Sequence, residues 1–156
     1  MSGPALSFII PAYNAQSTLP RTLASLRAQT RTDWQAVIVD DGSDDATQGL
    51  SYAAALKDPR ITLHAIARSG VSRARNFGLS KAEAEWVCFL DADDWITRDY
   101  CRVMLDAVRQ QLAGLEDLLD DHVGAVGEVV QGVEVRRGVA QAVGVVDAQP
   151  VDQPVV

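Results

Sequence analysis

Residues 86–94 read WVCFLDADD, an apolar run that ends abruptly in three carboxylates. Residues 34–45, WQAVIVDDGSDD, repeat this pattern, and a third apolar run, LSFII at residues 6–10, stops at Pro11. Continuous apolar runs of this length, bounded by turn-forming residues, are typical of strands that are buried on both faces of a parallel sheet. We therefore expect each run to be a strand with a polar loop at its carboxyl end.

Stretches with helical spacing separate these runs. The first is expected to have Ser17 as its N-cap and places Leu19, Leu23 and Leu26 on one face. The expected order is strand 6–10, helix from Ser17, strand 34–39, helix to Leu56, strand 61–66, helix 71–79, strand 86–90, and a helix from Thr97 with Tyr100, Val103, Met104, Ala107, Val108 and Gln111 on one side. This alternation predicts an α/β fold, a mainly parallel sheet between helices, with ligands beyond the carboxyl ends of the strands.

The charge of the chain is unevenly distributed. The 156 residues carry a formal net charge of −7, and 47% of them are hydrophobic, which fits one globular domain with a sizeable core. Residues 1–111 have 12 basic and 13 acidic side chains, whereas residues 112–156 have 2 and 8. The net charge argues against a nucleic-acid partner, although the front part is nearly neutral.

The cysteines and the apolar runs bear on cellular location. Cys88 and Cys101 have no metal-site spacing, and the apolar surroundings of Cys88 favour a buried thiol in a reducing compartment. No secretory leader and no run of about 20 apolar residues is present. We therefore expect a cytoplasmic protein, and the sequence leaves a peripheral association with the cytoplasmic membrane open.

Residues 112–156 differ in composition from the rest. These 45 positions hold 13 valines and 6 glycines but no Ser, Thr, Asn, Ile, Lys, Met, Cys, Phe, Tyr or Trp. A continuing α/β domain needs turn formers and aromatic core residues. We therefore divide the chain into a domain at 1–111 and an atypical tail at 112–156, for which our hypothesis is a shifted reading frame or a disordered segment, so that the fold is truncated.

Asp91 and Asp93 stand two positions apart at an expected strand end, where both can point into one cleft. Two such carboxylates repel each other unless a cation lies between them. Oxygen ligands suit Mg²⁺ or Mn²⁺, which complete their coordination with phosphate oxygens and water. The alternative is that these acids only complement the dipole of the following helix, and the triplet alone does not decide between the two.

The other two strand-end loops allow two interpretations each. Asp40 to Asp45 contains four carboxylates around Gly42, and it is either a turn capped by Ser43 or Asp44 or a set of acceptors for a base or ribose. Residues 11–14, PAYN, are either an ordinary loop or a platform on which Tyr13 lies against a planar base.

Four motifs occur in order: IIPAYNA at residues 9–15, DDGSDD at 40–45, SGVSRARNFG at 69–78 and FLDADDW at 89–95. In this combination the chain resembles the family 2 glycosyltransferases, which have the GT-A fold, over residues 6 to about 111. The resemblance implies transfer of a sugar from a nucleotide diphosphate donor, most often a UDP-sugar, with inversion at the anomeric carbon and a divalent metal. It also implies a glycan or lipid acceptor and a role in polysaccharide or glycoconjugate synthesis.

The resemblance assigns roles to six residues. Pro11 and Tyr13 would lie beside the nucleobase, and Asp41 would accept a hydrogen bond from the base. Arg75 would lie near the nucleotide or diphosphate, the alternative being a salt bridge within its own helix region. The remaining two are Asp91, at the ribose or metal, and Asp93, the metal ligand proper.

The general base of the family has no counterpart that we can name in this sequence. Acidic pairs at 116–117 and 120–121 fall on an expected helix, where a solvated face is the ordinary explanation. The catalytic residue therefore stays unassigned. Two functions remain in competition: sugar transfer, and binding of a nucleotide-sugar by a fragment that does not transfer it.

Overall fold

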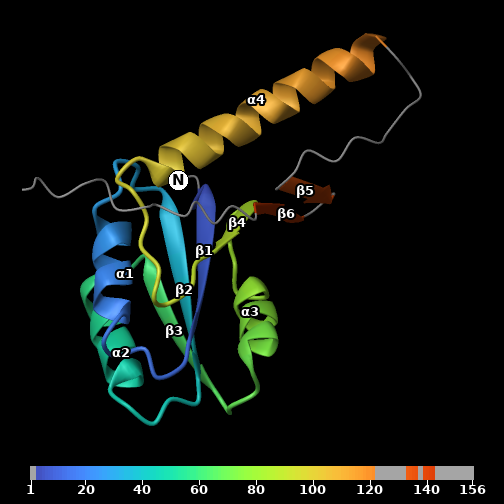
Figure 1. Ribbon diagram of the computed structural model, residues 1–156. Helices are drawn as coiled ribbons and strands as arrows, with labels where there is room; N and C mark the ends of the chain where they lie inside the picture. The colour runs from blue at the N-terminus through green and yellow to red at the C-terminus, as the bar shows by residue number, and fades with distance from the viewer. Residues whose placement is uncertain (1–2, 122–132, 137–138, 143–156) are drawn as a thin grey trace, which may run out of the picture.

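The computed structural model describes residues 3–121, 133–136 and 139–142, and the side chains of residues 3–112. A sheet with the strand order β3-β2-β1-β4-β6-β5 forms the centre of the described part (Figure 1). Its elements are β1 Leu6–Ala12, α1 Leu19–Arg27, β2 Trp34–Asp41, α2 Thr47–Lys57, β3 Ile61–Ile66, α3 Val71–Leu79, β4 Trp86–Phe89, α4 Tyr100–Asp121, β5 Val133–Arg136 and β6 Val139–Ala142.

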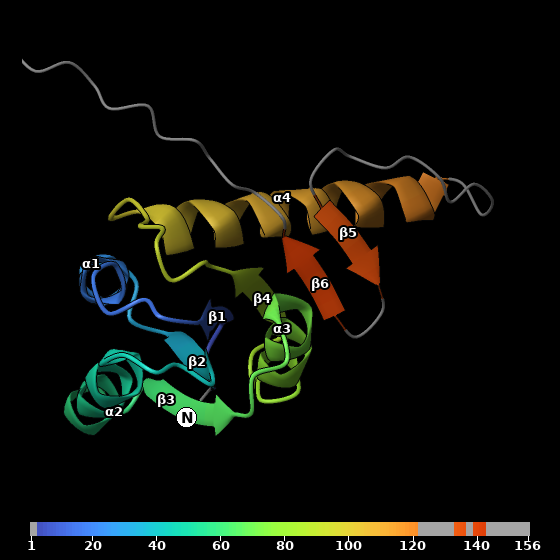
Figure 2. The same cartoon turned by 60° about the horizontal axis from the view of Figure 1, so that its bottom comes forward.

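Strands β1 to β4 are parallel, as the alternation of strands and helices predicted. β1 pairs with both β2 and β4, and β2 pairs with β3. Helices α1 and α2 cover one face of the sheet, and α3 covers the other (Figure 1, Figure 2). The carboxyl ends of these four strands consequently meet at one edge of the sheet.

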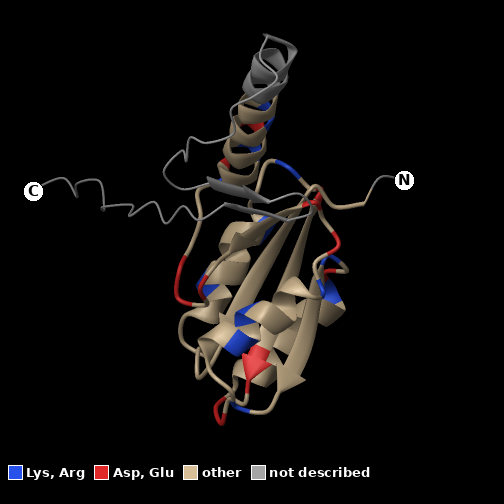
Figure 3. Ribbon diagram, turned by 90° about the vertical axis from the view of Figure 1, so that its right-hand side faces the viewer, with Lys and Arg blue, Asp and Glu red and all other residues tan. Residues whose placement is uncertain are grey.

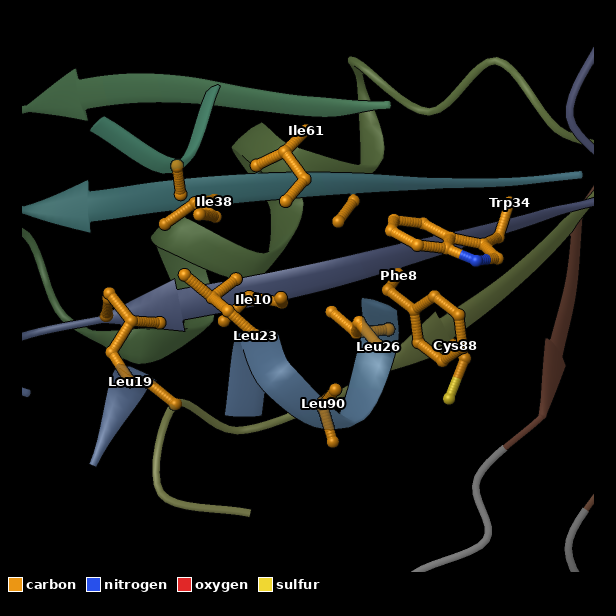
Figure 4. Close-up of a cluster of buried hydrophobic side chains, with 14 of the residues drawn as sticks. Phe8, Ile10, Leu19, Leu23, Leu26, Trp34, Ile38, Ile61, Cys88 and Leu90 are labelled. Atoms are coloured by element: carbon orange, nitrogen blue, oxygen red, sulfur yellow. The ribbon is translucent and has the colours of Figure 1, made fainter. Parts of the chain in front are cut away.

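Apolar side chains fill both faces of the sheet. On one face, Phe8 and Ile10 of β1 pack against Leu23 and Leu26 of α1 (Figure 4). On the other face, Ile9, Val37 and Val39 form a smaller cluster. The alternating residues of β1 thus serve two cores, which is why its sequence is continuously apolar.

The structure corrects several element boundaries. The N-cap position of α1 is Thr18, not Ser17, and that of α2 is Ala46, not Ser43 or Asp44; neither residue makes a side-chain capping hydrogen bond. Helix α4 begins at Tyr100, three residues later than predicted. Among the α4 side chains that the structure describes, Cys101, Leu105 and Val108 are buried; Val108 is on the predicted side, whereas Val103, on the same predicted side, is 51% exposed.

The tail predicted as atypical lies only partly within the described residues. Helix α4 continues to Asp121, and β6 pairs in parallel with β4, so that a segment of the tail lies beside the edge of β4. Residues 122–132, 137–138 and 143–156 are outside the described part. None of the helices within the described residues combines the length and apolar character needed to cross a bilayer.

Candidate functional site

The polar loops that follow the parallel strands gather at the carboxyl-terminal end of the sheet, which is at the bottom of Figure 1. The register places Ala12 beside Asp40 and Asp41 beside Ile66, so the loops after β1, β2 and β3 start side by side. Acidic and basic positions lie together at this end of the molecule (Figure 3). Because the loops have few apolar residues of their own, hydrogen bonds between them must set their shape.

The loops after β1 and β2 are joined by hydrogen bonds. The Asn14 amide donates to Ser43 Oγ at 3.0 Å, and the Asp44 amide donates to Asn14 Oδ1 at 3.1 Å. The Ala15 amide donates to the buried Thr47 Oγ1 at 2.8 Å. Asn14 adopts a φ of 47°, a left-handed conformation that asparagine tolerates better than most residues. The path of the chain around residue 13 is therefore fixed.

Tyr13 is one of the exposed residues at this edge. It is 42% exposed, and Pro11, two residues earlier, is buried within β1. The guanidinium carbon of Arg68 lies 3.2 Å from the centroid of the Tyr13 ring. The ring predicted to face a nucleobase thus offers a flat surface, and in this structure an arginine lies on it.

Asp41 holds the loop after β3. Its Oδ1 accepts from the amide of Ser69 at 2.7 Å and from the Ser69 hydroxyl at 3.0 Å, and its Oδ2 accepts from the amide of Gly70 at 2.8 Å. Asp41 is only 4% exposed, and its neighbour Asp40, 1% exposed, accepts from the Ser43 hydroxyl. The two carboxylates therefore fix the shape of the loops after β2 and β3 by accepting these hydrogen bonds. Their position in the sequence did not reveal this structural role.

Arg75 contacts Asp91 across the site. Its Nη2 donates to Asp91 Oδ1 at 2.6 Å, joining α3 to the loop after β4. A salt bridge within its own helix region, the alternative left open by the sequence, is therefore wrong. The buried Nε of Arg75 has no hydrogen-bond partner among the described residues. Arg75 thus presents a cation beside Asp91, so that a phosphate bound by the arginine would lie next to a metal ion bound by the carboxylate.

Helix α1 supports the loop that carries Asp91 and Asp93. The hydroxyl of Thr22, which is fully buried, lies 2.9 Å from the carbonyl oxygen of Ala92 and 2.6 Å from that of Asp94. Thr22 was not among the predicted site residues. Its signal was a hydroxyl on the apolar side of an amphipathic helix, three positions after Leu19 and one before Leu23.

Two more side chains hold residues 96–101, which follow this loop. They are Ser25 of α1 and Gln29, which lies two residues past the end of that helix. Ser25 Oγ accepts from the Ile96 amide at 3.2 Å. Gln29 Nε2 donates to the Thr97 carbonyl at 2.6 Å, and its Oε1 accepts from the Cys101 amide at 3.0 Å. The chain that leaves the site toward α4 is therefore bound along its length to α1.

Asp91 and Asp93 suit a hard divalent cation in chemistry and in exposure. Asp93 is exposed and Asp91 partly so, and the Asp94 amide closes a turn on the Asp91 carbonyl at 3.1 Å. Within the described residues no group of three or more His, Cys, Asp or Glu side chains forms a complete protein site. Mg²⁺ and Mn²⁺ are often held by one or two carboxylates plus substrate phosphates, so this pair fits such an ion.

Comparison with known proteins identifies the family. The sequence model of glycosyl transferase family 2 matches residues 7–117, and the chain belongs to this family. The succinoglycan biosynthesis protein ExoO of Rhizobium meliloti is 38% identical over 119 residues, which cover 76% of this chain and 33% of that protein. This chain thus spans about a third of the length of such relatives.

Two solved structures resemble the fold. TarS of S. aureus in complex with UDP gives a TM-score of 0.58 at 27% identity, covering 67% of this chain and 32% of that one. The mannosyltransferase PcManGT of Pyrobaculum calidifontis, in complex with GDP-Man and Mn²⁺, gives 0.53 at 27% identity, covering 60% and 29%. The GT-A fold inferred from the four motifs is therefore confirmed.

Proposed function

We propose that this chain binds a nucleotide-diphosphate sugar, with Mn²⁺ or Mg²⁺, for inverting transfer of the sugar to a glycan or lipid acceptor. The pathway would be polysaccharide or glycoconjugate synthesis, as the name of ExoO says of that protein. A UDP-sugar is the favoured donor, in keeping with the UDP bound to TarS. We place this activity at the cytoplasmic side of the cell, free or peripheral to the membrane.

The observation that carries the proposal is the contact between Arg75 and Asp91. Arg75 comes from the loop-helix unit after β3 and Asp91 from the loop after β4, yet their side chains meet at 2.6 Å. A cation next to a carboxylate pair is what a metal-bound diphosphate requires, because the metal is held by the acids and the phosphate by the arginine.

Each of the other residues has a part in donor binding. Tyr13 and Pro11 form the wall against which the base lies. Asp41 orders the amides of Ser69 and Gly70, and its carboxylate keeps lone pairs to accept from the base. The cation held by Asp91 and Asp93 would supply charge neutralisation for the diphosphate as it leaves.

Calorimetry with UDP, in the presence and absence of Mn²⁺, tests the proposal. We expect Mn²⁺ to strengthen UDP binding by the unaltered chain, and Asp93→Ala to abolish that increase while thermal unfolding stays unchanged. Glu85→Ala is a matched control, because it removes one exposed carboxylate before the start of β4, at the opposite end from Asp91. Undiminished Mn²⁺-dependent affinity in Asp93→Ala would remove the metal assignment.

The second candidate function is donor binding without transfer. The proposed function gives the Asp41 carboxylate to the base and Asp91 to the metal and Arg75, so neither is assigned to take a proton from an acceptor hydroxyl. Hydrolysis or transfer from a UDP-sugar, measured on the same preparation that binds UDP, separates the two functions. Binding without turnover supports the second.

A further inference from the structure

Arg68 lies on the surface that the proposed function gives to the nucleobase. Its guanidinium carbon stands 3.2 Å from the Tyr13 ring centroid, which is a stacking contact. Arg68 immediately precedes Ser69, whose amide is bound to Asp41. Arg68 therefore reaches the Tyr13 ring from the loop whose amides Asp41 binds, and it covers one face of the ring that the proposed function gives to the base.

The backbone of Arg68 is held in place, so only its side chain can leave. A Cβ added at Gly42 would lie 2.8 Å from the Arg68 amide nitrogen, which shows how closely the two backbones approach. The next two amides, of Ser69 and Gly70, are bound to the Asp41 carboxylate. The Arg68 side chain itself is exposed and belongs to a flexible residue type.

We propose that Arg68 is a competing occupant of the nucleobase platform and thereby lowers the affinity of this chain for its donor. A base and a guanidinium cannot stack on the same face of one ring, since each needs carbon atoms at roughly 3.5 Å from it. Donor binding must break the contact between Arg68 and Tyr13 before the base can stack. This inference rests on the proposed function.

Binding of uridine, which has no phosphate, measures the competition without the attraction between an arginine and a diphosphate. We expect Arg68→Ala to bind uridine about two- to fivefold more tightly than the unaltered chain, which is the equivalent of one exposed cation–π contact. Arg68→Lys keeps the charge but loses the flat guanidinium, and it should also bind more tightly. Arg73→Ala, which removes an exposed arginine of α3, should leave the affinity unchanged.

Unchanged or weaker uridine binding by Arg68→Ala, with normal binding by the unaltered chain, would overturn this inference alone. Absence of UDP and uridine binding by every variant would overturn the proposed function as well. A nucleotide-free measurement is independent of both outcomes: the Arg68 Nε–H resonance should carry a ring-current shift that Tyr13→Leu removes. An Arg68 resonance that Tyr13→Leu leaves unchanged would refute the stacked state itself.

Discussion

The link between Thr22 and the loop of Asp91 and Asp93 gives the sharpest structural prediction. The Thr22 hydroxyl lies within hydrogen-bonding distance of two carbonyl oxygens, of Ala92 and Asp94, and the side chain is fully buried. Thr22→Val keeps the shape but removes the donor. One hydroxyl hydrogen shared by two acceptors contributes about one hydrogen bond, and losing it removes this donor from both oxygens, which costs about 1–2 kcal/mol.

Two measurements separate the effect on stability from the effect on the site. For a chain of 156 residues, about 1–2 kcal/mol corresponds to a fall in Tm of roughly 2–8 °C. UDP binding is compared at 15 °C, a temperature chosen so that Thr22→Val stays folded. We expect Mn²⁺ to strengthen UDP binding less in Thr22→Val than in the unaltered chain, because the loop after β4 is no longer tied to α1. UDP binding without Mn²⁺ should change less.

Thr22→Ser is the matched control, because it keeps the hydroxyl and loses only a methyl group. It should retain the Mn²⁺ effect even if its Tm falls. Equal Mn²⁺-dependent affinity in Thr22→Val and the unaltered chain would refute the view that α1 positions the metal loop.

Three further predictions concern the fold. Gly78→Ala should lower the free energy of unfolding by about 1–3 kcal/mol in urea titrations, because its Cβ would lie 2.4 Å from Ile9 Cγ2. The ion pair with Arg60 lowers the pKa of Asp58 below its ordinary value of 3.8. The stability that this ion pair adds is therefore present above pH 3.8 and is lost as the pH falls through the lowered pKa. Asp58→Asn should be less stable than the unaltered chain at pH 7, and the difference between their free energies of unfolding should shrink in acid. Burial raises the pKa of Cys101 to about 12, so iodoacetamide should not label this thiol at pH 8 until urea unfolds the chain, as mass spectrometry can show.

The sequence predicted the sheet well because its signal is local. β3 and α3 begin and end at the predicted residues, since each is a compact run bounded by turn formers. β2 extends two residues further than expected, through Asp40 and Asp41. Carboxylates at the end of a strand argue for a loop, but Asp41 has its donors in the loop after β3, a contact that the local pattern does not contain.

The candidate site was predictable in position but not in its contacts. Parallel strands with polar ends fix the edge where the loops meet, so Tyr13, Asp41 and Asp91 could be placed there from the sequence. Arg68 could not, because its contact with Tyr13 depends on the direction of one side chain across two loops. The buried face of α4 was predicted only in part: Val108 is buried as expected, but Cys101 and Leu105 lay off the predicted side and Val103 is exposed.

The extent of the family match bears on where a change of reading frame in the tail would fall. The family match extends to residue 117 and α4 to Asp121, past the compositional break after Gln111. Helix in this stretch does not test the frame, because Leu, Ala and Glu favour helix whatever their origin. We propose that the frame changes within the codons for residues 112–121. The coding DNA should then show a family-like continuation in another phase from that point; a native frame with no such continuation would reject the hypothesis and make the valine-rich tail a true part of the chain.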